Sequence, residues 1–225
     1  MQGHIGPMVY LVGMEAEEKH RLAALLHSVE LTVEDRFGLD EVCRTHPAEL
    51  PGCALIDLES GAFSQFQSEH SIPWPQPPPL SLVVIGGAGV DVRTAVEIMR
   101  QNAFDFLIRP LNDQQLLDCV HRALRHDEER AAEAAARRNL MSRLAMLTPR
   151  EREVLTAVVE GGSNQEVAIR LGISPKTVEV HRTRLQRKLG AQCYPELVRM
   201  GVLGGLIPEV PALPAEEDER KSARG

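Results

Sequence analysis

Residues 147–189 read LTPREREVLTAVVEGGSNQEVAIRLGISPKTVEVHRTRLQRKL and contain three successive helix starts. Each start has a hydroxyl residue that can cap a helix, followed within three positions by a proline or a glutamate; the three are Thr148, Ser163 and Ser174. Glycines mark the helix ends, at Gly161, Gly162, Gly172 and Gly190. The stretch therefore predicts three helices joined by tight turns.

The third of these helices is basic and has two different faces. On a helical wheel the packing face consists of Val178, His181, Leu185 and Leu189. The opposite face holds Lys176, Val180, Thr183 and Arg187, flanked by Glu179 and Arg184. A short helix, a glycine turn and a basic helix are typical of a helix-turn-helix, whose second helix enters the DNA major groove.

Lysine and arginine on such a face pair with phosphates, and the shorter side chains reach base edges. The candidate DNA-binding residues are Lys176, Thr177, Glu179, Val180, His181, Thr183, Arg184 and Arg187. The expected partner is double-stranded DNA bound by a homodimer.

The segments LTPREREVL and GGSNQEVAIRLGISPKTVEVHRTRLQRKL closely resemble the DNA-binding domain of the LuxR family, over about residues 144–207. The resemblance implies a fourth helix at about 195–203 that often serves as a dimer contact. It also implies base contacts at Glu179, Val180 and Thr183. For His181 it implies a place near the phosphate backbone, whereas the wheel makes His181 a packing residue, and both interpretations stay open.

The chain has 225 residues and a net charge of −7, but the charge is unevenly distributed. Residues 1–125 hold nine Lys and Arg against 17 Asp and Glu, a net charge of −8, whereas residues 143–208 hold ten against six, a net charge of +4. This asymmetry predicts two domains with different partners. The four cysteines are widely spaced, so zinc is not expected. Without a long apolar run or a secretory signal, we expect a cytoplasmic protein with no membrane contact.

The first 125 residues alternate between strand and helix patterns. Strands are indicated at 9–12, 54–58, 82–85 and 104–108, and helices at 15–29, 92–99 and from 112 onward. Such alternation predicts a parallel sheet with helices on both faces. Ligands of these sheets gather at the carboxyl ends of the strands, where Asp57 and Arg109 lie.

The segments MVYLV, ALIDL, AVEIM and NAFDFLIRPLNDQQLLDCVHRAL resemble, in order, a response-regulator receiver domain. A receiver followed by a LuxR-type domain is the layout of the NarL/FixJ family. The expected fold is an α/β receiver, with a flavodoxin-like parallel five-stranded sheet, followed by an all-α helix-turn-helix domain. Asp57 matches the phosphoacceptor position of that family and Phe106 its aromatic switch position.

Other receiver positions depart from the family pattern. Gly13 and Met14 replace the acidic pair that holds Mg²⁺, so Mg²⁺ binding is doubtful and no cofactor is expected. Gly86 replaces the usual hydroxyl residue, and Arg109 replaces the usual lysine. We therefore expect an atypical receiver that is phosphorylated poorly or not at all, in which Arg109 can form a static salt bridge with Asp57. The alternative is ordinary phosphorylation of Asp57, with Glu15 recruited by a register shift.

The sequence is compatible with three roles for the domain formed by residues 1–125. One is phosphorylation by a histidine kinase, the second is sensing of a ligand or redox state with Cys53 as a candidate, and the third is an adaptor or dimerisation role. An enzyme is disfavoured because no nucleophile–base pair or metal cluster is recognisable.

The expected domain bounds are 7–125 for the receiver, 126–142 for a helical linker, 143–208 for the DNA-binding domain and 209–225 for a disordered tail. The stretch 111–147 lacks Gly and Pro and predicts one long helix or two joined by a kink, as a solvated linker or a dimer stalk. In the proline-rich segment 72–80, Trp74 is expected to cover the core edge. The resemblance implies a cis Arg109–Pro110 bond.

Overall fold

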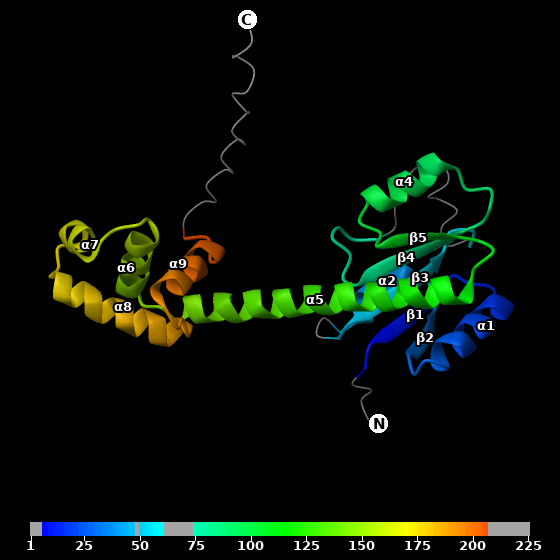
Figure 1. The fold of residues 1–225 in the computed structure, drawn as a ribbon, viewed down its shortest axis with the longest axis horizontal. Coiled ribbons are helices and arrows are strands. Elements are labelled where there is room, and N and C mark those ends of the chain that lie inside the picture. Colours follow the sequence, from blue (N-terminus) through cyan, green and yellow to red (C-terminus); the bar gives the residue numbers. More distant parts are fainter. Residues whose placement is uncertain (1–5, 48–49, 61–73, 207–225) are drawn as a thin grey trace, which may run out of the picture. The chain divides into compact units, whose positions relative to one another are not determined.

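The computed structural model describes residues 6–47, 50–60 and 74–206, and the chain divides into two compact units between Ala135 and Ala136. The first unit is α/β and the second is helical, which confirms the predicted fold classes. The predicted tail at 209–225 lies outside the described residues. Each unit is shown in Figure 1.

The first unit is built on a parallel sheet of five strands in the order β2-β1-β3-β4-β5. The strands are β1 (Met8–Val12), β2 (Thr32–Arg36), β3 (Gly52–Asp57), β4 (Ser81–Gly86) and β5 (Asp105–Ile108). The central strands β3 and β4 are buried along their whole length, as expected for a parallel sheet covered on both faces. The carboxyl ends of β3 and β5 carry Asp57 and, one residue past the strand, Arg109.

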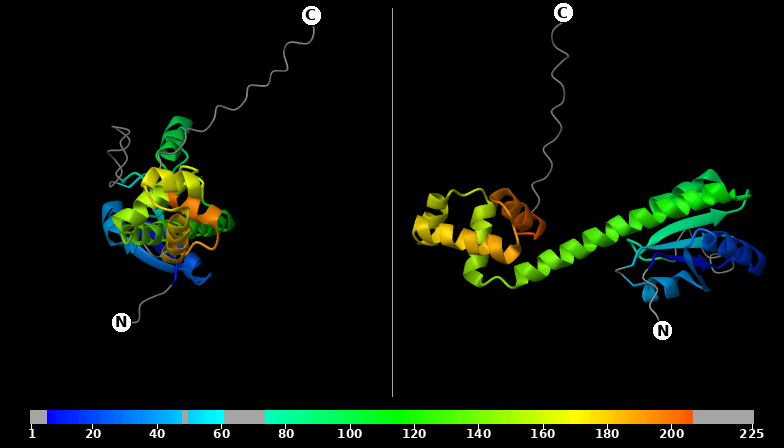
Figure 2. Two further views of the ribbon diagram at one scale, coloured as in Figure 1. Left: turned by 90° about the vertical axis from the view of Figure 1, so that its left-hand side faces the viewer. Right: turned by 60° about the horizontal axis from the view of Figure 1, so that its bottom comes forward.

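Helices cover both faces of this sheet, as the ribbon shows (Figure 2). On one face, α1 (Ala16–His27) and the first part of α5 (Asp113–Ala145) pack on side chains such as Leu11, Leu55 and Val83. On the other, α2 (Leu39–Thr45) and α4 (Val92–Arg100) pack on alternate residues of the same strands, such as Ile56 and Val84. Because successive side chains of a strand point to opposite faces of the sheet, each strand contributes to the two cores in turn.

The proline-rich segment contributes to the second of these cores through Trp74. Its side chain is buried, and its Nε1 donates to the backbone oxygen of Gln101 at 3.0 Å. The expectation that Trp74 covers the core edge is therefore confirmed. The Arg109–Pro110 bond is cis, as expected.

The connector predicted at 111–147 is one continuous helix, α5. Its residues 132–139 are exposed throughout, whereas Asp127 near the end of the first unit is 1% exposed. Asp127 accepts the backbone N–H of Gly52 at 2.8 Å and pairs with Arg130, which also donates to the carbonyls of Pro78 and Pro79. These bonds tie α5 to the amino-terminal ends of β3 and β4.

The second unit contains α6 (Pro149–Val159), α7 (Asn164–Leu171), α8 (Pro175–Leu189) and α9 (Tyr194–Leu203). The predicted caps are present: Thr148 and Ser163 each form a capping box, and Ser174 accepts the backbone N–H of Thr177. Gly172 and Gly190 end α7 and α8 with φ of 64° and 75°, in the left-handed region that glycine adopts without strain.

The core of the second unit joins these helices to the end of α5. Val178, Leu185 and Leu189 of α8 are fully buried beside Leu155 of α6 and Leu197 of α9. The right-hand view of Figure 2 shows α8 running past the shorter helices. One side of α8 is therefore fixed in an apolar core.

A buried carboxylate reinforces this arrangement. Glu151, 6% exposed, caps α6 by accepting the backbone N–H of Thr148 at 3.0 Å, and it also pairs with Lys188 of α8 at 2.7 Å. The Lys188 ammonium and the Thr148 N–H hold the pKa of Glu151 at about 2, below its ordinary value of 4.5. Glu151 thus links the start of α6 to the last turn of α8.

We expect the substitution Asp127→Ala to lower the free energy of unfolding of the first unit by about 1–3 kcal/mol, because it leaves the buried Gly52 N–H without its acceptor. Urea denaturation of the full chain measures this loss. Glu128→Ala, an exposed change on the same helix, is the control and should cost less than about 0.5 kcal/mol. Equal midpoints for the two variants would contradict the role of Asp127.

The depressed pKa of Glu151 predicts an acid-sensitive second unit. Its ionic contribution to stability is complete above the unfolded pKa near 4.5 and is lost as pH falls toward about 2. The melting temperature of Glu151→Gln should therefore lie below wild type at pH 6, and the gap should narrow between pH 5 and 2. Glu153→Gln, on the exposed side of α6, should show no such convergence. A gap that stays constant with pH would rule out the ionic role.

Candidate nucleic-acid interface and receiver pocket

The outward side of α8 forms a shallow hollow, lined by Lys176, Glu179, Val180, Thr183, Arg184 and Arg187. All six are exposed, and Val180 at its centre is 41% exposed although it is apolar. Thr177 is also exposed, at the first turn. The structure therefore brings together the side chains that the helical wheel placed on one side. Whether they contact DNA stays a prediction.

Two of the five basic residues of α8 have intramolecular roles that the sequence did not indicate. Lys188 pairs with Glu151, and Arg182 bonds to Asn164 of α7 while its guanidinium lies 3.8 Å from the ring centre of Tyr194. Arg184 and Arg187 are exposed. Only part of the positive charge of α8 is therefore directed outward.

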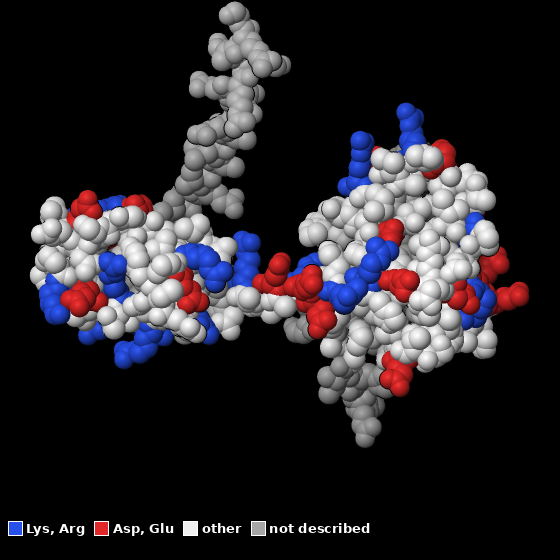
Figure 3. Space-filling model, viewed as in Figure 1, with Lys and Arg blue, Asp and Glu red and all other residues white. Residues whose placement is uncertain are grey.

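Lys176 and Glu179 form an exposed ion pair across one helical turn, at 2.9 Å. Their side chains are 80% and 57% exposed, so the pair is weak in water and both groups can be redirected by a polar ligand. In Figure 3, Lys and Arg project from the edge of the second unit over α8.

His181 was expected either to pack inside the protein or to lie near the DNA phosphate backbone, and its environment has features of both. The residue is half-buried, and its Nδ1 is buried without a hydrogen-bond partner among the described residues. One edge of the ring therefore packs in the protein, as the wheel indicated. The rest of the side chain is accessible, so the contact with the phosphate backbone that the LuxR-family resemblance implies stays a prediction.

In the first unit, Arg109 binds Asp57 at the carboxyl end of β3, as expected from the sequence. Asp57 is 5% exposed, and Arg109 reaches both its oxygens, with Nη2 3.1 Å from Oδ2 and Nη1 3.3 Å from Oδ1. The backbone N–H of Glu59 donates to Oδ1 at 2.9 Å. The buried carboxylate is thus compensated by a bidentate guanidinium and a backbone donor.

Two further carboxylates on Arg109 were not predicted. Glu18 of α1 is the tightest partner, with its Oε2 2.6 Å from Nη2, and Glu59 lies 3.5 Å from Nη1. Hydrogen bonding to Glu18, together with the charge of Asp57, raises the pKa of Arg109 above its ordinary value. We call Asp57, Glu18, Glu59 and Arg109 the Arg109 cluster.

The positions that replace the family's acidic pair have other roles. Gly13 has a φ of 73°, and Met14 is 7% exposed and packs in the core between the sheet and α1. Glu15, the carboxylate considered as a substitute, is exposed at the start of α1. Neither residue 13 nor residue 14 offers an oxygen ligand from its side chain.

Gly86 and Phe106, which together with Arg109 occupy the switch positions of the receiver, lie against each other. A Cβ atom added to Gly86 would lie 2.7 Å from Cζ of Phe106 and 2.9 Å from Val90. The Phe106 ring, half-buried, therefore occupies the space that a hydroxyl side chain at position 86 needs.

Cys53, considered as a redox candidate, is fully buried within β3. Burial raises the pKa of its thiol well above the ordinary value, so the reactive thiolate is suppressed. This environment is that of a core residue and does not favour redox sensing at Cys53.

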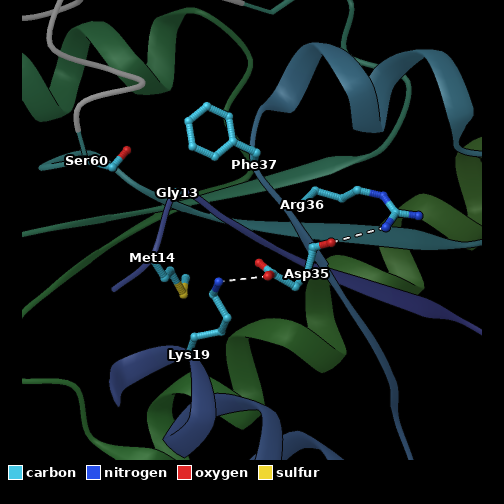
Figure 4. A pocket seen from close by; sticks show the side chains of 7 residues that line it. All are labelled: Gly13, Met14, Lys19, Asp35, Arg36, Phe37 and Ser60. Atoms are coloured by element: carbon cyan, nitrogen blue, oxygen red, sulfur yellow. Dashed lines mark hydrogen bonds and ion pairs between the residues drawn. The ribbon is translucent and has the colours of Figure 1, made fainter. Parts of the chain in front are cut away.

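A pocket beside the Arg109 cluster opens at the ends of β1, β2 and β3 (Figure 4); it is lined by Gly13, Met14, Lys19, Asp35, Arg36, Phe37 and Ser60. Its cations are already paired, Lys19 with Asp35 at 2.7 Å and Arg36 with Glu34. Phe37 is 89% exposed at its rim. The pocket therefore offers no unpaired charge among its described lining residues.

Within the described ranges, no cluster of three or more His, Cys, Asp or Glu side chains is arranged to hold a metal ion. The described helices also include none with the length and apolar character needed to cross a membrane.

Comparison with known proteins identifies both units. Residues 145–201 match the family model of bacterial regulatory proteins, luxR family. The transcriptional regulatory protein FixJ of Azorhizobium caulinodans is 41% identical over 216 residues, which cover 92% of this chain and 97% of FixJ. The transcriptional regulatory protein TdiR of Thauera aromatica is 33% identical over 202 residues, covering 87% of this chain and 86% of TdiR.

A solved structure agrees with these sequence relations. The response regulator StyR superposes with a TM-score of 0.66 at 27% identity, covering 87% of this chain and 98% of StyR. The parallel sheet, the four helices of the second unit and the relatives that span both units lead to one conclusion. The chain belongs to the NarL/FixJ family of response regulators and is a transcription regulator with a LuxR-type DNA-binding domain.

Proposed function

We propose that the protein recognises specific sites in double-stranded DNA through the outward side of α8, and that its receiver works without ordinary Mg²⁺-dependent phosphorylation of Asp57. The observation that carries the first part is the division of α8 into a buried apolar side and an exposed polar side. A helix that is fixed on one side and exposed on the other can enter the major groove without unfolding its own domain.

The roles within α8 follow from side-chain chemistry. Lys176, Arg184 and Arg187 are the proposed phosphate contacts, because their charge releases counterions from DNA. His181 is a further candidate, as a hydrogen-bond partner of the backbone. Val180, Thr183 and Glu179 are the proposed base contacts: Val180 can pack on a thymine methyl group, and Glu179 can accept from the cytosine amino group. Thr177 lies beside them at the first turn.

The protein is proposed to bind as a homodimer on a roughly palindromic operator, with half-sites about one helical turn, or ~34 Å, apart. Val202 and Leu203 at the end of α9 are 39% and 55% exposed, which supports α9 as one dimer contact. Exposed residues 132–139 of α5 are mostly Ala and Arg and offer only a weak seam for a stalk.

The atypical receiver is supported by the Arg109 cluster. Transfer of a phosphoryl group to Asp57 needs a free carboxylate oxygen and a cation beside it. Both oxygens of Asp57 already face Arg109, and Arg109 is further held by Glu18.

The residues present also fit Mg²⁺ poorly. Mg²⁺ prefers octahedral oxygen ligands with one or two carboxylates. Met14 is buried in the core, Gly13 has no side chain, and the guanidinium of Arg109 places a positive charge against Asp57. A divalent cation at this carboxylate would meet that charge, so no step of the proposed function involves Mg²⁺.

Phosphorylation by a histidine kinase is the second candidate input, because Asp57 lies buried at the end of β3 and the relatives include response regulators. Under this candidate, wild-type protein takes up phosphate from acetyl phosphate and the Asp57→Asn variant does not. An adaptor role, in which the acidic front domain contacts another protein, remains compatible with the Arg109 cluster.

We expect full-length protein incubated with acetyl phosphate and Mg²⁺ to show no more phosphate than its Asp57→Asn variant, because Arg109 occupies the acceptor. Phos-tag electrophoresis and intact mass measure the label. A response regulator that acetyl phosphate labels under the same conditions is the positive control. Stoichiometric label on wild type that disappears in Asp57→Asn would establish ordinary phosphorylation instead.

For DNA, a duplex selected by the wild-type protein from a random library is the probe. Lys176→Ala should weaken binding to all duplexes and lower the salt slope by about 1, because one phosphate contact is lost. Val180→Ala should relax base choice at one position of the selected site with little change in slope. Fluorescence anisotropy at several salt concentrations distinguishes the two effects.

Lys19→Ala, which removes a half-buried cation of the receiver paired with Asp35, is the control and should leave affinity and slope unchanged. Unchanged affinity and unchanged slope in Lys176→Ala would remove Lys176 from the interface.

A further inference from the structure

The last turn of the connector helix α5 reaches the last turn of the DNA-recognition helix α8. Nη1 of Arg143 donates to the backbone oxygen of Leu189, the final residue of α8, at 2.7 Å. Arg143 is half-buried, and Leu189 is fully buried. The bond joins residues 46 positions apart and is not a local feature of α5.

This contact has a clear physical basis. The carboxyl end of a helix carries unsatisfied carbonyls and a partial negative charge, which a guanidinium stabilises. Gly190, which ends α8 with a φ of 75°, leaves room for it: a side chain there would contact Nη1 of Arg143. Gly190 therefore adopts the left-handed conformation that ends α8, and its lack of a side chain leaves space for the guanidinium of Arg143.

The end of α5 is itself built into the second unit. Leu144 is 3% exposed in the core beside Leu155 and Leu189, and Leu140 packs against that core. Arg152 of α6 donates to the backbone oxygen of Leu144 at 2.9 Å. Arg143 therefore projects from a fixed backbone.

Two charged groups thus hold the last turn of α8 from neighbouring helices, Arg143 on its terminal carbonyl and Glu151 on the ammonium of Lys188. Arg187, one of the proposed phosphate contacts, belongs to this held turn. Lys176 lies at the other end of α8, near the Ser174 cap. The LuxR-family match begins at residue 145 and leaves Arg143 outside.

We propose that Arg143 is a positioning residue for DNA recognition: it fixes the carboxyl end of α8 and so places Arg187 on the DNA backbone. The inference rests on the proposed DNA contact of α8. It makes the end of the connector helix a working part of the recognition surface, although Arg143 itself need not touch DNA.

The test uses the full-length protein, the selected duplex and a scrambled duplex of equal length. Arg143→Met, which keeps much of the apolar stem and removes the guanidinium, should weaken binding to the selected duplex about tenfold, the scale of one charge-assisted hydrogen bond. Binding to the scrambled duplex should weaken as well, and the salt slope should fall by up to about 1, because the phosphate contact of Arg187 is lost on both duplexes. Arg143→Lys should recover most of the affinity, and Arg137→Met, an exposed change on α5, should match wild type.

A double-mutant cycle separates positioning from a general loss of structure. Arg143→Met and Arg187→Ala should be non-additive, because the second contact depends on the first. Arg143→Met and Lys176→Ala should be additive, because Lys176 lies at the other end of α8. If Arg143→Met proves unfolded by circular dichroism, Arg143→Gln replaces it in both cycles with the same expectations.

Equal binding by Arg143→Met and Arg137→Met would overturn the inference, as would additivity in both cycles. A salt slope that is lower by about 1 in the double variant Arg143→Met/Arg187→Ala than in Arg187→Ala alone would show a direct phosphate contact of Arg143 and contradict positioning. The proposed function fails separately: if Arg187→Ala and Lys176→Ala both bind like wild type, α8 is not the DNA-binding surface, whatever Arg143 does.

Discussion

The second unit depends on the burial of one side of α8. Val178, Leu185 and Leu189 are fully enclosed, so α8 cannot roll or withdraw without opening the core. The charges are arranged around this constraint: Lys188 is held by Glu151, and Arg182 lies against Tyr194. The backbone that carries the remaining outward side chains is therefore held in place, which reduces the conformational entropy lost on binding a rigid duplex.

The receiver shares its fold with the response regulator StyR, and its strand ends carry a cluster of charged side chains around Arg109. One guanidinium contacts three carboxylates drawn from β3, its following loop and α1. The guanidinium offsets the charge of one of them, and its bonds to Asp57 and Glu18 satisfy the two less exposed carboxylates inside the protein.

The fold was largely predictable because helix caps and apolar periods are local signals, and Thr148, Ser163 and Ser174 all act as predicted. Strand β2 was not recognised: as an edge strand with sequence TVEDR it has little apolar alternation. Glu18 and Arg143 were also missed, because their partners lie 91 and 46 positions away. Contacts of that kind arise from tertiary packing and leave no pattern in neighbouring residues.

The contact between Gly86 and Phe106 bears on reversibility. Threonine introduced alone at position 86 collides with the aromatic ring, and aspartate introduced alone at position 14 brings a charge into an apolar core. A hydroxyl side chain at position 86 therefore requires the half-buried Phe106 ring to move, and a carboxylate at position 14 requires its own desolvation to be offset. Restoring the family's usual residues at these two positions thus depends on how far the neighbouring side chains can adjust.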